Sequence, residues 1–93
     1  MRLMMRFTIP VEKGNEAEAD GSMGKAIEKL IADTNAEAAY FTMLDGERSG
    51  FIFFEEADQA NLTKYNEPMF AALDAAIDIV PVLTLDDLKR GLG

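Results

Sequence analysis

The dipeptide Asp45-Gly46 stands between two apolar segments and limits the possible folds more than any other feature of the sequence. Asp-Gly suits a type I′ turn, which needs a positive φ at two successive residues and commonly closes a β-hairpin. We therefore predict a hairpin with strands at 38–44 and 47–55. A two-residue turn also fixes the register of the two strands. The predicted facing pairs are Tyr40 with Phe51, Phe41 with Gly50, and Thr42 with Ser49.

Two further strands are predicted near the ends of the chain. The segment 2–9 alternates in polarity, which is typical of a strand that has two different faces. Pro10 ends it, because proline has no N–H to donate to a sheet. The last strand is expected at 77–83. One face of the first strand carries Leu3, Met5, Phe7 and Ile9, and the other carries Arg2, Met4, Arg6 and Thr8.

The segments between the strands show helical spacing. After a loop at 12–15, a first helix is expected from Glu16, because Asn15 and Glu18 resemble a capping box; Ser22 is a second possible start. A second helix is expected from Asp58, with a kink or break at Pro68, where Asn66 or Glu67 would cap a new segment. Thr84-Leu85-Asp86-Asp87 predicts a short helix before Gly91.

The expected order is β-α-β-β-α-β with a short C-terminal helix, which is the ferredoxin-like α+β pattern in a single domain, residues 1–93. Right-handed crossovers place the first strand between the third and the fourth in an antiparallel sheet. Both long helices then cover one face, and the other face is too apolar to meet water. A chain this short buries only about 60 % of its surface, so we expect a homodimer through that face.

Composition excludes several functions. The net charge is −8, with 17 acidic and 9 basic residues. A nucleic-acid backbone and an anionic membrane surface would both be repelled. There is no cysteine and no histidine, so we expect no disulfide, metal site or cofactor, and a cytoplasmic location. Glu55-Glu56-x-Asp58 is interpreted as a solvated strand end with a helix cap rather than a metal site.

The sequence resembles the dimeric α+β-barrel superfamily, and within it a set of short bacterial proteins of unknown function. The resemblance rests on segment 7–15, Pro81-Val82 and Asp86-Asp87-Leu88. It implies a fold and a dimer. Members include cofactor-free monooxygenases, muconolactone isomerases, haem enzymes and ligand-binding domains. The His-Asp pair of some short members and histidine-ligated haem do not carry over, because this chain has no histidine.

Arg6 is the most informative polar residue, because it stands in the middle of a predicted central strand. Asp78 on the last strand is its expected partner, and Tyr40 is expected on the same face. One interpretation is a structural ion pair at the dimer interface. The other is that Arg6 binds an anionic or carbonyl group, with Tyr40 or Asp78 as a hydrogen-bonding or acid–base partner. Arg48 is expected in solvent, opposite Met43.

The segment Tyr65-Asn66-Glu67-Pro68 is a second candidate. A helix broken above a sheet exposes backbone groups, so Tyr65 and Asn66 are candidate ligand-binding residues. Glu67 is either a helix cap or, if its pKa is raised by burial, a general base.

Three functions remain open. The first is a binding or accessory module for a small apolar or aromatic molecule, held in a pocket between sheet and helices. The second is a cofactor-independent isomerase or monooxygenase for an aromatic or lactone-like substrate, using Arg6, Tyr40, Glu67 and Asp78. The third is a purely structural dimer.

Overall fold

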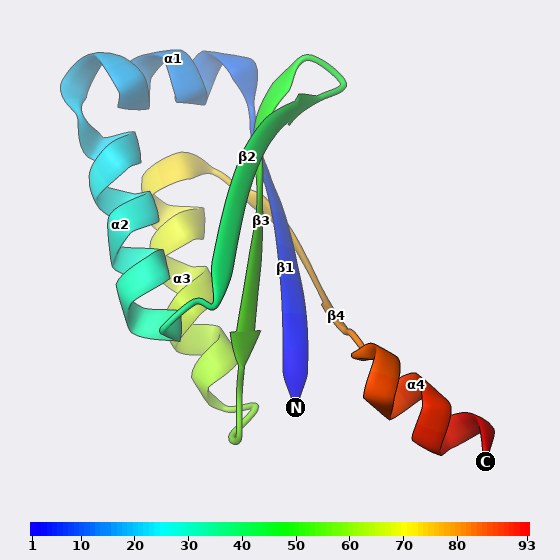
Figure 1. The fold of residues 1–93 in the computed structure, drawn as a ribbon. Coiled ribbons are helices and arrows are strands. Elements are labelled where there is room, and N and C mark those ends of the chain that lie inside the picture. The colour runs from blue at the N-terminus through cyan, green and yellow to red at the C-terminus, as the bar shows by residue number, and fades with distance from the viewer.

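A computed structural model describes residues 1–93 as an α+β arrangement with a four-stranded antiparallel sheet and four helices (Figure 1). None of the helices is both long and apolar enough to cross a lipid bilayer. The elements are β1 (Arg2–Ile9), α1 (Val11–Asp20), α2 (Ser22–Thr34), β2 (Ala38–Leu44), β3 (Glu47–Glu55), α3 (Asn61–Leu73), β4 (Ala76–Pro81) and α4 (Leu85–Leu92).

The β2–β3 hairpin forms with the predicted bounds and register. Asp45 and Gly46 both have positive φ, at 52° and 78°, as a type I′ turn requires. All three predicted facing pairs are present, Tyr40 with Phe51, Phe41 with Gly50, and Thr42 with Ser49. A local turn signal therefore determined the pairing of two whole strands.

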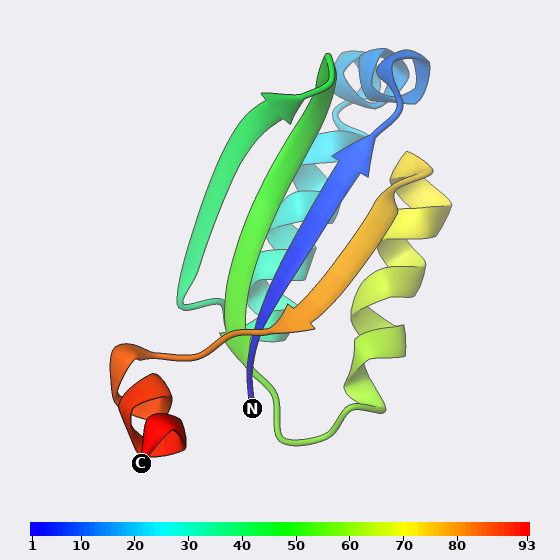
Figure 2. The same ribbon diagram turned by 90° about the vertical axis from the view of Figure 1, so that its right-hand side faces the viewer.

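The sheet has the order β2-β3-β1-β4, with β1 in the middle as the crossover rule predicted (Figure 2). The strand β1 pairs with β3 on one side and with β4 on the other. Arg6 consequently faces Phe51 and Asp78 across its two neighbours.

Helices α2 and α3 cover one face of the sheet, and the opposite face has no helix packed on it (Figures 1 and 2). The core between sheet and helices is small: only 16 of 93 residues are buried. The largest buried side chains are Phe7, Phe54, Met5, Ile9, Ile52, Met69 and Leu73. We call the uncovered side the open face; by register it carries the large apolar and aromatic residues Met4, Tyr40, Phe51, Phe53 and Val80 together with the polar residues Arg2, Arg6, Thr8, Thr42, Ser49, Glu55 and Asp78.

The first helical region begins earlier than predicted. Residues 12–15 are not a loop, because α1 starts at Val11 directly after Pro10, whose carbonyl accepts from Gly14 N at 2.8 Å. Asn15 lies inside α1 and caps nothing. Gly21, with φ of 80°, separates α1 from α2, so the second possible start at Ser22 is confirmed.

The other boundaries also shift. Helix α3 starts at Asn61 rather than Asp58 and continues through Pro68, so the expected break is absent. Met69 and Leu73 are buried beyond the proline, and their packing stabilises the last turns of the helix. Strand β4 ends at Pro81, two residues early. The Thr84 capping box is confirmed, and α4 runs past Gly91.

Candidate functional site

An apolar cavity of about 230 Å³ lies between the sheet and α2, next to the edge strand β2. We call it the Arg48 cavity. Phe41 is 54 % exposed, so the cavity reaches the surface at that edge. Thr42, Arg48 and Ser49 are its only polar residues. It is lined by Phe7, Ile9, Met23, Ile27, Phe41, Thr42, Arg48 and Ser49.

Arg48 does not sit in solvent as expected, although it does pair with Met43. It is half-buried, and its Nη1 donates to Asn15 Oδ1 at 3.1 Å. A Cβ added to Gly14 would lie 2.7 Å from the same Nη1. The side chain of Arg48 therefore packs against α1 at Gly14, where the lack of a Cβ leaves room for it. Gly14 and Asn15 together hold the guanidinium beside the cavity.

Gly50 of β3 lies between Phe7 of β1 and Phe41 of β2, its partners in the sheet. A Cβ at this position would lie 2.5 Å from two ring atoms of Phe7 and 3.1 Å from Phe41 Cδ1. Only glycine leaves room for both rings, and both rings line the cavity. The shape of the apolar wall therefore depends on Gly50.

The predicted pair of Arg6 and Asp78 forms on the open face, with Nη2 and Oδ2 2.5 Å apart. Tyr40 and Phe51 continue the same row across β2 and β3. Tyr40 is 65 % exposed, and its ring meets Phe53 edge-on with centroids 6.5 Å apart. These candidates lie on the side of the sheet away from the Arg48 cavity.

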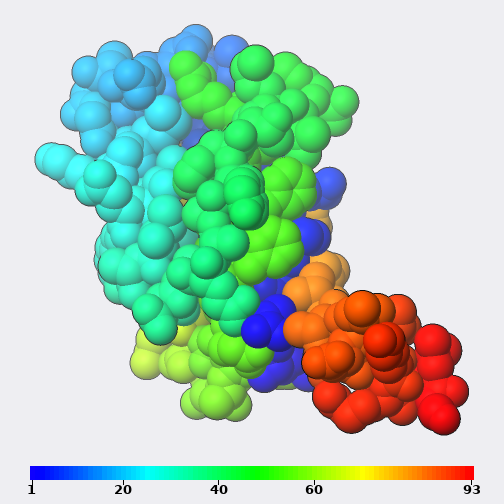
Figure 3. Space-filling view, in the orientation of Figure 1, coloured from blue at the N-terminus to red at the C-terminus, as the bar shows by residue number.

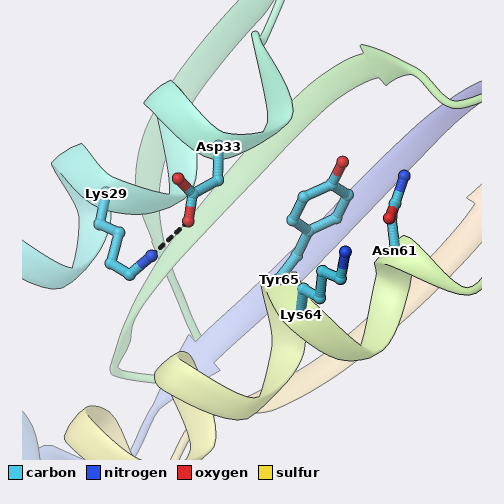
Figure 4. A pocket seen from close by; sticks show the side chains of 5 residues that line it. All are labelled: Lys29, Asp33, Asn61, Lys64 and Tyr65. Carbon is cyan, nitrogen blue, oxygen red and sulfur yellow. Dashed lines mark hydrogen bonds and ion pairs between the residues drawn. The ribbon is translucent and has the colours of Figure 1, made fainter.

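The candidates on α3 do not meet the Arg6 row. Tyr65 lines a polar groove between α2 and α3, formed with Lys29, Asp33, Asn61 and Lys64 (Figure 4). Within it Lys29 Nζ and Asp33 Oδ2 pair at 2.5 Å. Asn66 is half-buried and lines no cavity, and its Oδ1 is buried without a hydrogen-bond partner. Glu67 is exposed within the continuous helix, where it caps nothing.

Glu56 is a buried carboxylate that was expected in solvent; it is only 8 % exposed. It accepts from Tyr65 Oη at 2.5 Å, from Asn61 Nδ2 at 2.9 Å and from Asp58 N at 3.1 Å. These hydrogen bonds, that of Tyr65 foremost, lower the pKa of Glu56. The same contact, with burial, raises the pKa of Tyr65 to about 12. At neutral pH Glu56 is therefore ionised and Tyr65 is neutral, which are their usual charge states. This favours a structural role for the pair, which links the end of β3 to α3.

No protein-family model matches the chain, and no curated protein matches it in sequence.

Proposed function

We propose that the protein is a binding or accessory module that holds a small organic molecule in the Arg48 cavity. The observation that carries this proposal is the apolar lining of the cavity, with five apolar side chains and one arginine around a space that reaches the surface. Ligand sites of proteins are commonly concave and mostly apolar, with a few polar groups that set orientation. The volume of about 230 Å³ suits a ligand with a single ring or a short alkyl chain.

Titration with indole, a small neutral aromatic compound, tests this proposal. Amide chemical shifts should change around Phe7, Ile27 and Phe41. Ile27→Trp should fill the cavity and abolish those changes, whereas Ala32→Trp, at an exposed position of the same helix, should leave them intact. Shifts that survive in Ile27→Trp, or a native protein that binds neither indole nor any of the carboxylates and amides named below, would contradict a binding role.

We also propose that two copies pair through the open face, each with a ferredoxin-like fold as in dimeric α+β barrels. Phe51, Phe53 and Met4 remain only half-buried there, and Val80 is 42 % exposed. An antiparallel sheet can have one face in water, but that face is then normally polar. In such a dimer the Arg6–Asp78 pair would lie within the interface, which favours its structural interpretation. The lack of cysteine fits a reducing compartment, and we propose the cytoplasm.

We favour binding over the isomerase or monooxygenase alternative. The walls of the Arg48 cavity carry no carboxylate and no tyrosine, the groups that this alternative requires for proton transfer. Arg6, Tyr40 and Asp78 point to the other side of the sheet, and Glu67 lines no cavity.

A further inference from the structure

Arg48 differs from the other arginines of the chain in its partners. The sequence has four arginines, and three of them contact a carboxylate: Arg2, Arg6 and Arg90. Arg48 has no carboxylate partner, and its one hydrogen bond is to the neutral amide of Asn15. In a chain with 17 acidic residues, the one arginine beside an apolar cavity is also the one that forms no ion pair.

The position of this charge is fixed by two neighbours on α1. Asn15 accepts from one nitrogen of the guanidinium, and Gly14 leaves the space in which that nitrogen lies. Nε and Nη2 have no hydrogen-bond acceptor within the chain. A guanidinium has five N–H donors in a planar fork, so donors remain for a ligand. Because the fork is already held in place, less side-chain freedom is lost when a ligand binds.

We propose that the ligand of the Arg48 cavity is an apolar carboxylate, with its carboxylate at Arg48 and its apolar body between Phe7, Ile27 and Phe41. This inference rests on the proposed binding function and adds the chemical class of the ligand. Arginine and a carboxylate form a charge-assisted and often bidentate pair, which is stronger than a pair of neutral groups. The apolar walls disfavour sugars and polyphosphates, whose polar groups would lose water without finding partners.

Calorimetric titration of the native protein tests the ligand class. The probes are phenylacetate and octanoate, each compared with its uncharged amide, phenylacetamide or octanamide. We expect at least one carboxylate to bind about tenfold or more tightly than its amide, a difference within the range of a charge-assisted hydrogen bond. The comparison of phenylacetate with octanoate distinguishes an aromatic ligand from a fatty acid.

An isosteric variant isolates the charge of Arg48. Asn15→Asp places a carboxylate where Asn15 Oδ1 now accepts at 3.1 Å, so it should occupy the guanidinium and abolish the preference for the carboxylate probe. Asn35→Asp gives the same change in net charge at an exposed position and should keep the preference. Arg48→Met, which keeps the apolar stem, should weaken carboxylate binding and leave amide binding unchanged.

The outcomes distinguish failure of the proposed ligand class from failure of the proposed binding function. If carboxylate and amide bind equally well, or if Asn15→Asp keeps the preference, the ligand class is wrong and the binding function stands on the indole titration. If the carboxylates, their amides and indole all fail to bind, both proposals are wrong. A preference that Asn15→Asp removes and Asn35→Asp retains supports the assignment.

Discussion

At the scale of single residues, Glu56 shows most clearly how the fold uses a charge. Its side chain is nearly buried at the end of β3, and it contacts three donors from the segment that leads into α3 and from α3 itself. A buried carboxylate is costly unless its oxygens accept hydrogen bonds, and here they accept three. The cluster therefore fixes the start of α3 against the sheet.

The pKa of Tyr65 predicts a loss of stability in alkali. Its pKa is about 12 in the folded protein and 10.0 without these contacts, so its contribution is fully present below pH 10 and is lost as the pH rises through about 12. Tyr65→Phe should remove this part of the pH dependence, whereas Tyr40→Phe, at an exposed tyrosine, should retain it. Urea unfolding followed by circular dichroism measures both. Equal alkaline profiles for the two variants would show that the Glu56 contact has no energetic effect.

Arg48 shows what the sequence could and could not reveal at this scale. Residues 48, 50, 52 and 54 share one face of β3, and Ile52 and Phe54 are buried in the core. Strand alternation therefore carried a signal that Arg48 points toward the helices. The contact between Arg48 and Asn15 could not be predicted from the sequence, because it depends on α1 starting at Val11. Arg6 was predictable, since adjacent strands bring it to Asp78.

At the scale of elements, local signals predicted the strands better than the helices. Asp45-Gly46 determined the hairpin, and Pro10 ended β1. The continuity of α3 through Pro68 was not predictable locally, because it depends on the packing of Met69 and Leu73 beneath it. The early start of α1 was missed for a related reason: Gly14 weakens a helix by itself but is required beneath Arg48.

Two glycine-to-alanine substitutions should have opposite effects on elements. In β3, Gly50→Ala would drive a Cβ against Phe7 and should destabilise the protein by about 1–3 kcal/mol. In α2, Gly24→Ala meets no atom within 4 Å and should stabilise the helix by up to about 1 kcal/mol. Thermal or urea unfolding provides both values. If Gly50→Ala leaves the free energy of unfolding unchanged, the hairpin can move away from β1. The wall of the Arg48 cavity could then deform.

At the scale of the whole molecule, α4 stands apart from the rest. It extends from the end of β4 on the open side of the sheet, away from α2 and α3 (Figures 1 and 2), and forms a separate lobe in the space-filling view (Figure 3). The radius of gyration is 14.3 Å, against about 12 Å for a compact chain of this length. None of its residues is buried, and Leu85, Leu88 and Leu92 are 65, 45 and 79 % exposed.

These leucines recur at helical spacing, and charged residues such as Asp86 and Arg90 lie on the other side of the helix. The apolar side of this helix has no partner in its own chain. We therefore expect a second copy to cover it together with the open face. The strand order was predictable from general topological rules, and so was the capping of α4. The direction in which α4 extends was not, because no local signal in the chain fixes it.

Native mass spectrometry tests directly whether one side of the sheet binds a ligand and the other side binds a second copy. We predict a species of two chains that takes up two molecules of phenylacetate or octanoate, whichever binds more tightly, one for each Arg48 cavity. Leu88→Gln should weaken the dimer by about tenfold or more, because it removes an apolar contact, whereas Asp86→Asn on the polar side of α4 should not. A single chain without bound ligand at micromolar concentration would contradict both the dimer and the ligand site.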